Sequence, residues 1–179
     1  MIVKTIIDED FVNYKKPSMF IAFPTCTWKC EKECGERVCQ NSTLATAPNI
    51  EIDAENIIKR YIDNPLTSAI VIGGLEPFDS LPDLYDLIVK FRKQCNDDIV
   101  IYTGYTEDEL HQNTKYDFIF NLENDMQMVI PKCDMFEHIL LNFKNIVIKF
   151  GRFVPNQTPH YDDALGVNLA SDNQYAKRF

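Results

Sequence analysis

Short apolar runs recur along the chain with segments of helical periodicity between them, and this alternation is the feature that most limits the possible folds. Five runs have the length and composition of strands: they cover residues 19–24, 68–72, 98–102, 116–121 and 145–150. Continuously apolar strands are typical of parallel sheets that are buried on both faces. Strands that alternate with helices imply right-handed crossovers. The sequence therefore predicts an α/β fold with a mainly parallel sheet.

The helices between these runs are indicated by capping residues and by apolar spacing. Ser, Thr and Asp side chains accept hydrogen bonds from the first free N–H groups of a helix, so they are candidate N-caps. Thr106 and Glu109 have in addition the spacing of a capping box. Helices are therefore expected at residues 53–61 and 80–91, from residue 106, and at 135–143, whereas residues 122–132 show no clear pattern.

The length of the chain predicts a single domain. Its 179 residues, 45% of them hydrophobic, can bury one sizeable core but not two ordinary ones. No apolar run approaches the roughly eighteen residues of a transmembrane helix. The formal net charge of −9 opposes sequence-independent binding to a phosphate backbone. We therefore expect one cytoplasmic domain that binds neither nucleic acid nor a membrane.

Four of the six cysteines lie within residues 26–39. Without a secretory signal, thiols stay reduced, so such a group is typical of metal binding or catalysis rather than of disulfides. Three thiolates can hold an iron-sulfur cluster and leave one iron with an open position. The spacing pairs Cys26 with Cys30 but leaves the third ligand open between Cys34 and Cys39. A structural zinc site is the alternative, although zinc sites usually combine close cysteines with a distant second pair.

Three polar or glycine-containing turns follow successive predicted strands. Residues 26–39 follow the first, residues 73–74 the second and residues 103–105 the third. Because ligands of such sheets bind at the carboxyl ends of the strands, these turns are expected to meet at one edge. Glycine lets a backbone approach a ligand closely, and Glu76 can accept a hydrogen bond from an ammonium group. By itself, the glycine segment equally fits an ordinary strand-to-helix turn.

Four segments together resemble the radical S-adenosylmethionine (SAM) superfamily. They are Cys26-Thr-Trp-Lys-Cys30, Gly-Leu-Glu-Pro at 74–77, Tyr-Thr-Gly-Tyr-Thr at 102–106 and Leu-Ala-Ser-Asp-Asn-Gln at 169–174. The last two are similar, more narrowly, to the activating proteins of anaerobic ribonucleotide reductases, which are glycyl radical activases. The resemblance covers a core of about 19–174. It implies a single radical SAM-like domain with a partial (β/α)6-type barrel.

The cysteine motif of the superfamily is usually C-x3-C-x2-C, followed by an aromatic residue and an asparagine. In this chain the x2 spacing falls on Glu33, but Cys39-Gln40-Asn41 keeps an asparagine two residues after a cysteine. The resemblance therefore implies that a [4Fe-4S] cluster is held by Cys26, Cys30 and Cys39, with Cys34 as the alternative third ligand.

The resemblance also implies SAM as a cofactor. A reduced cluster would bind the amino and carboxylate groups of SAM, and one electron would break the bond between the sulfonium and the 5′ carbon. The resulting 5′-deoxyadenosyl radical abstracts a hydrogen atom from a substrate. The implied SAM contacts are Gly73, Gly74 and Glu76 near the methionyl ammonium, Thr103, Gly104 and Tyr105 beside the nucleoside, and Asn173 and Gln174 at the adenine side. Leu75 either replaces the second glycine of the superfamily's glycine-glycine-glutamate motif or is inserted after it.

In the activases that the chain resembles, the hydrogen comes from a glycine of the large subunit of an anaerobic ribonucleotide reductase. The implied partners are that subunit and an electron donor such as flavodoxin or ferredoxin. A radical SAM enzyme acting on another protein, a peptide or a small molecule is the first alternative. A zinc-stabilised interaction module is the second. His111, His138 and His160 have no mutual metal-ligand spacing and are expected to be structural or surface residues.

Overall fold

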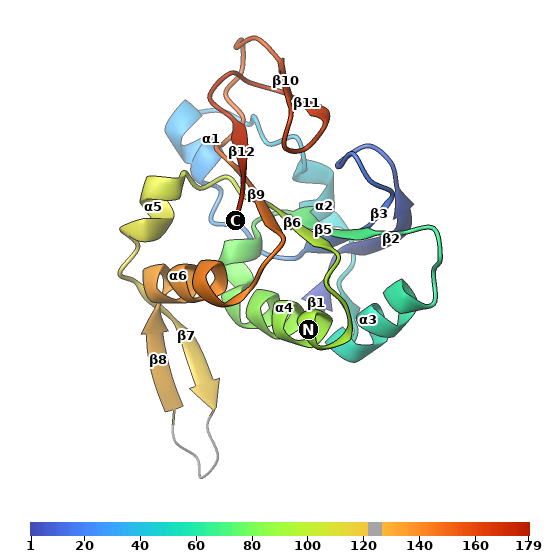
Figure 1. Ribbon diagram of the computed structural model, residues 1–179. Coiled ribbons are helices and arrows are strands. Elements are labelled where there is room, and N and C mark those ends of the chain that lie inside the picture. Colours follow the sequence, from blue (N-terminus) through green and yellow to red (C-terminus); the bar gives the residue numbers. More distant parts are fainter. Residues whose placement is uncertain (122–126) are drawn as a thin grey trace.

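The central sheet has six strands within the residues that the computed structural model describes, which are 1–121 and 127–179 (Figure 1). The strands lie in the order β12-β9-β6-β5-β3-β2. The inner four pair in parallel: β3 (Ser18–Phe23), β5 (Ala69–Gly74), β6 (Asp98–Tyr102) and β9 (Ile146–Phe150). The outer two, β2 (Thr5–Asp10) and β12 (Tyr175–Arg178), pair antiparallel with their neighbours. The predicted α/β fold with a mainly parallel sheet is therefore confirmed.

The expected (β/α)6-type barrel is not confirmed. The strand predicted at 116–121 forms β7 (Tyr116–Asn121), but β7 pairs with β8 (Gln127–Pro131) in a separate antiparallel hairpin that projects from the sheet in Figure 1. At the other edge, residues 11–17 connect β2 to β3. This connection is too short for the crossover of about a dozen residues that parallel pairing needs. β2 and β3 therefore pair antiparallel.

Three helices cover one face of the sheet (Figure 1). They are α3 (Ala54–Ile62), α4 (Leu81–Gln94) and α6 (Lys132–Asn142), so the helices predicted at 53–61, 80–91 and 135–143 are confirmed within a few residues. Alternate strand residues point to this face, among them Ile70 and Ile72 of β5, and pack with helix residues in one buried core. The burial of apolar surface in this layer is the main source of stability.

The opposite face is covered by irregular chain rather than by long helices. Val71 of β5 packs there against Tyr14 and Leu165. Tyr14 lies in the connection 11–17, and Leu165 lies in the long segment after β9, which contains the hairpin of β10 (His160–Asp162) and β11 (Val167–Leu169). The Lys15 N–H donates a hydrogen bond to the Leu165 carbonyl at 2.7 Å and so joins the two segments. These two segments therefore cover this face of the sheet.

The remaining elements are short. They are β1 (Ile2–Val3), α1 (Lys29–Cys34), α2 (Ser42–Thr46), β4 (Ile50–Glu51), the 3₁₀ helix η1 (Pro77–Ser80) and α5 (Glu107–His111). The cysteine segment, expected as a loop, thus contains the helix α1. Among the described residues, no helix is both long and apolar enough to cross a membrane.

Of the predicted helix N-caps, only the capping box of α5 forms its side-chain hydrogen bonds within the described residues. Thr106 and Glu109 form the predicted capping box at the start of α5. Asp53 and Ser80 stand at the N-cap positions of α3 and α4, but neither side chain makes a cap hydrogen bond to a described residue. The Ser80 hydroxyl lies instead 2.5 Å from the hydroxyl of Thr25. The start of α4 therefore holds the chain that leads into the cysteines.

A buried carboxylate ties both sides of the sheet together. Asp98, at the start of β6, accepts hydrogen bonds from Arg178 of β12 and from the Tyr14 hydroxyl, each at 2.8 Å. Lys16 lies 2.6 Å from the same carboxylate. Burial alone raises the pKa of Asp98, but the hydrogen bonds from Arg178, Lys16 and Tyr14 together lower it well below its usual range. Asp98 therefore links an edge strand and the 11–17 connection to the centre of the sheet.

We predict that Asp98→Asn lowers the free energy of unfolding by about 3 kcal/mol at neutral pH, because it leaves cations beside a neutral buried amide. Since the folded state lowers this pKa, the stabilisation is present above the pKa of the unfolded chain, about 4, and is lost as the pH falls below it. Urea unfolding at neutral and acid pH measures both effects. Asp86→Asn, which breaks an exposed pair with Lys90, should change stability by less than about 0.5 kcal/mol. Equal losses in the two variants would contradict the role of Asp98.

Candidate functional site

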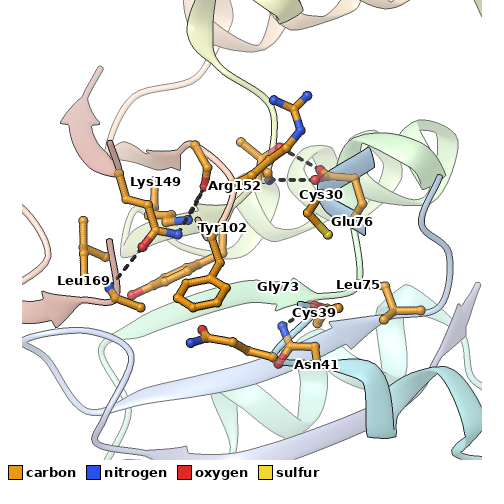
Figure 2. Close-up of a pocket in the computed structure, with 18 of the residues that line it drawn as sticks. Cys30, Cys39, Asn41, Gly73, Leu75, Glu76, Tyr102, Lys149, Arg152 and Leu169 are labelled. Carbon is orange, nitrogen blue, oxygen red and sulfur yellow. Dashed lines mark hydrogen bonds between the residues drawn. The ribbon is translucent and has the colours of Figure 1, made fainter. Parts of the chain in front are cut away.

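A cavity of about 320 Å³ lies at the carboxyl ends of the parallel strands. Its wall combines the cysteine segment after β3, the glycine turn of β5, the turn after β6 and the segment after β9 (Figure 2). The turns that the sequence predicts at one edge of the sheet thus line one cavity. The predicted site residues on its lining are Cys26, Cys30, Cys39, Gly73, Gly74, Glu76, Thr103, Gly104, Tyr105 and Gln174. In the described structure, Cys34 and Asn173 lie outside this lining.

The three lining cysteines come from different parts of the cysteine segment. Cys26 precedes α1, Cys30 lies on α1 and Cys39 lies between α1 and α2, and all three are free thiols. Burial, together with the neighbouring Glu76 and Asp79 carboxylates, raises the pKa of Cys26 to about 12, against the effect of the hydrogen bond from the Trp28 N–H. Burial also raises the pKa of Cys30, with the nearby Cys39 as the next contribution. The structure therefore brings the three thiols together in a half-buried environment.

These thiols fit the ligand chemistry of an iron-sulfur cluster. In a cluster each thiolate binds a separate iron, so the sulfurs surround the group rather than converge on a single ion. Over the described residues, no three His, Cys, Asp or Glu side chains are arranged to hold a single metal ion. Three thiols on one cavity wall are the donors that a [4Fe-4S] cluster with an open iron requires. That Cys39 rather than Cys34 is the third ligand stays a prediction, which its place on the lining favours.

Glu76 is the central acid of the cavity wall. One carboxylate oxygen accepts a hydrogen bond from the Thr103 hydroxyl at 2.8 Å, and the other accepts one from the Gly104 N–H at 2.8 Å. The Phe78 N–H donates to the first oxygen at 3.1 Å. Burial nevertheless raises the pKa of Glu76 to about 7, against the effect of these hydrogen bonds. Glu76 therefore fastens the turn after β6 to the end of β5 and presents a buried carboxyl group beside the thiols.

Gly74 occupies a position that only glycine can adopt. Its φ is +89°, and a Cβ there would lie 2.7 Å from the Cα of Ala22 on the neighbouring strand β3. The carbonyl of Gly74 accepts a hydrogen bond from the Asn41 amide at 2.7 Å. Asn41, which follows Cys39 by two residues, thus connects the cysteine segment to the glycine turn. Leu75, the departure from the superfamily's motif, lies on the cavity lining (Figure 2).

Lys149 is a cavity residue that the sequence analysis missed. It lies on β9, is 7% exposed, and its ammonium group donates a hydrogen bond to the Gly151 carbonyl at 2.6 Å. Burial lowers the pKa of Lys149 to about 8, while the nearby Glu76 carboxylate opposes this effect. The sequence does contain a sign of this residue, because Lys149 is the one charged residue in the otherwise apolar run Ile146–Phe150. The cavity thus contains a buried cation as well as a buried acid.

The two C-terminal residues of the predicted site have different positions. Gln174 lines the cavity, accepts a hydrogen bond from the Ala170 N–H at 3.0 Å and donates one to the Gly151 carbonyl at 3.3 Å. Asn173 instead donates to the Arg152 carbonyl at 2.9 Å. Both residues therefore hold the segment after β9 in place, and of the two Gln174 faces the cavity.

Residues 18–135 match the model of a protein family described as a 4Fe-4S single cluster domain. The matched span covers more than half of the chain and includes the cysteines, the glycine turn and the turn after β6. The cavity wall supplied by β9 and the C-terminal segment lies beyond it. The chain matches none of the curated proteins. The family description favours an iron-sulfur cluster over the zinc alternative.

We predict that Cys26→Ala, Cys30→Ala and Cys39→Ala each abolish cluster binding, because a thiolate ligand is lost in each case. Cys34→Ala should retain the cluster. Iron and acid-labile sulfide, measured after anaerobic reconstitution, report the result, with Cys133→Ala as a control from outside the cysteine segment. A retained cluster in Cys39→Ala together with a lost cluster in Cys34→Ala would reverse the choice of third ligand.

Proposed function

The chain belongs to the 4Fe-4S single cluster domain family, and from this premise we propose that it is a radical SAM enzyme that generates the glycyl radical of an anaerobic ribonucleotide reductase. The family assignment makes it an iron-sulfur, radical SAM-like protein. Three points go beyond the family assignment and belong to the proposal. They are the binding of SAM, its reductive cleavage and the identity of the substrate.

The observation that carries the proposal is the set of groups around one cavity. Three thiols, a buried acid and a buried cation line the same wall. SAM carries an ammonium and a carboxylate on its methionyl part, so it needs a partner of each sign beside a cluster ligand set. Glu76 is suited to accept from the ammonium, and Lys149 is suited to donate to the carboxylate. The Lys149 ammonium makes one hydrogen bond within the described residues and has further N–H groups to offer.

When bound, the cluster and SAM supply the chemistry: one-electron reduction of the sulfonium releases methionine and a 5′-deoxyadenosyl radical that abstracts a hydrogen atom. The residues of the chain would bind and orient these two groups and exclude water from them. Thr103 and Gly104, both bonded to Glu76, form a fixed wall for the nucleoside. Phe20 and Tyr102 add aromatic surface, and apolar lining of this kind keeps water from a reactive intermediate.

The choice of a reductase as substrate rests on the resemblance of the segments 102–106 and 169–174 to the activases. The cavity supports this choice in one respect. Its outer wall is made by irregular chain, the connection 11–17 and the segment 151–174, rather than by further strands of a closed barrel. Such a wall is compatible with a polypeptide segment as substrate. The partners of the proposed enzyme are the large reductase subunit and a flavodoxin or ferredoxin.

The first test is incubation of the reconstituted, reduced protein with SAM. We predict that 5′-deoxyadenosine and methionine form, and that adding an anaerobic ribonucleotide reductase gives a glycyl radical signal in electron paramagnetic resonance. An intact cluster without 5′-deoxyadenosine would contradict the radical SAM activity. Formation of 5′-deoxyadenosine without a glycyl radical would contradict the reductase as substrate and leave the cleavage standing.

The second test concerns the buried cation. We predict that Lys149→Met weakens SAM binding to the cluster-loaded protein at least about tenfold, because it removes a desolvated charge-assisted hydrogen bond while keeping the side-chain volume. Equilibrium dialysis with labelled SAM measures the change. Lys177→Met is the matched control, since Lys177 lies on the next strand and pairs with Glu107 at the surface. An unchanged affinity in Lys149→Met would remove Lys149 from the proposed site.

A further inference from the structure

Helix α1, which carries Cys30, has little to hold it against the rest of the protein. Not one of its residues, all of which the structure describes, is buried, and its N-cap Trp28 makes no side-chain cap hydrogen bond to them. Trp28 also has a left-handed backbone, with φ 56°, which is unfavourable for a residue with a side chain. A helix of this length does not form by itself in water. The position of α1 therefore depends on polar contacts with other elements.

Those contacts converge on Glu109 of α5. The Lys29 ammonium, at the first position of α1, donates to one oxygen of the Glu109 carboxylate. The Arg152 guanidinium donates to both oxygens, at 2.7 and 2.6 Å. Arg152 also lies 3.5 Å from the Glu33 carboxylate at the far end of α1. One carboxylate thus connects the cysteine helix to α5 and to the segment after β9.

The negative charge of Glu109 compensates the positive charges of Lys29 and Arg152. Lys29 and Arg152 both line the cavity, and both are cations in contact with the same carboxylate. Burial raises the pKa of Glu109, but the hydrogen bonds from Arg152 and Lys29 lower it to about 2, so the carboxylate is ionised at neutral pH. With a neutral residue in its place, two like charges would face each other, and the attraction that draws α1 toward α5 would be lost.

Glu109 has a second, separable role in the capping box of α5. Its carboxylate accepts from the Thr106 N–H at 2.9 Å, and its own N–H donates to the Thr106 hydroxyl at 3.1 Å. Glutamine serves at this position of a capping box as well as glutamate does. Glu109→Gln therefore keeps the cap of α5 and removes the charge that Lys29 and Arg152 share.

We propose that Glu109 is a positioning residue for the cysteine helix: through Lys29 and Arg152 it holds α1, and with it the Cys30 thiol, against the cavity. Asp79 has a related task one step earlier, since its carboxylate accepts from the Thr27 N–H at 2.8 Å. Asp79 thus fastens the chain before α1, and Glu109 fastens the helix itself. This inference does not depend on what the cavity binds.

The test measures how well the Cys30 thiol is held in protein without a cluster. Under anaerobic conditions, iodoacetamide alkylation of each cysteine is followed by mass spectrometry of its peptide. We expect Glu109→Gln to speed alkylation of Cys30 about fivefold, the effect of losing a partly exposed charge-assisted contact. Cys95, at the end of α4, is the internal reference and should not change. An unchanged rate at Cys30 would overturn the proposal.

Glu33→Gln is the matched control. It makes the same change of charge on α1 itself but loses the longer 3.5 Å contact of an exposed side chain. We expect it to change the rate at Cys30 by less than about twofold. An effect as large as that of Glu109→Gln would mean that net charge near the thiol, rather than the attachment of α1, controls its reactivity.

Lys29→Gln separates positioning from direct electrostatics. If charge alone acted on the thiolate, removing the cation would slow alkylation and removing the carboxylate would speed it. If α1 is released, Glu109→Gln and Lys29→Gln both speed the alkylation of Cys30, and the double variant is little faster than either single variant. Opposite directions in the two single variants would overturn the proposal. Lys29 is outside the capping box, so this variant also carries the test should Glu109→Gln disturb α5. Neither SAM nor a cluster is needed, so failure here leaves the proposed function untouched.

Discussion

The parallel pairing of β3, β5, β6 and β9 is the constraint on which the site depends. Parallel strands all end at the same edge, so four chain segments that are far apart in the sequence begin there together. One of them brings the cysteines, the second the glycine turn and Glu76, the third Thr103 and Gly104, and the last Lys149 and Arg152. The cavity lies between these segments. The helices pack on one face of the sheet, and irregular chain covers the opposite face.

Charged groups at this edge are held in pairs or networks, since isolated charges are costly away from water. Glu76 is buried with three hydrogen-bond donors around it, and Lys149 is buried close by with one acceptor. At the rim, Glu109 joins two cations that would otherwise repel each other. The inner groups suit the binding of a zwitterionic ligand, and the outer group suits the attachment of a helix that has no buried side chain.

Local sequence pattern was sufficient for most of the fold. Four of the five apolar runs became the parallel strands β3, β5, β6 and β9, because such runs are stable where both faces are buried. The capping box at Thr106 formed as expected, since its hydrogen bonds involve neighbours in the chain. The partner of the strand at 116–121 did not follow from its own residues. It pairs with β8 instead of entering the sheet, and the segment between them, residues 122–126, lies outside the described residues.

The sequence alone predicted metal chemistry, because thiols grouped at close spacing indicate metal binding without coordinates, and the family match then favoured an iron-sulfur cluster over zinc. Its spacing left the third ligand open between Cys34 and Cys39, since spacing along the chain does not say which way a thiol faces, and only the resemblance to the superfamily favoured Cys39. Folding placed Cys39 on the cavity lining and brought in Lys149, Arg152 and Glu109, whose contacts join residues that are distant in sequence. Such contacts leave no local pattern to read, because they depend on where the strands end rather than on which residues are adjacent.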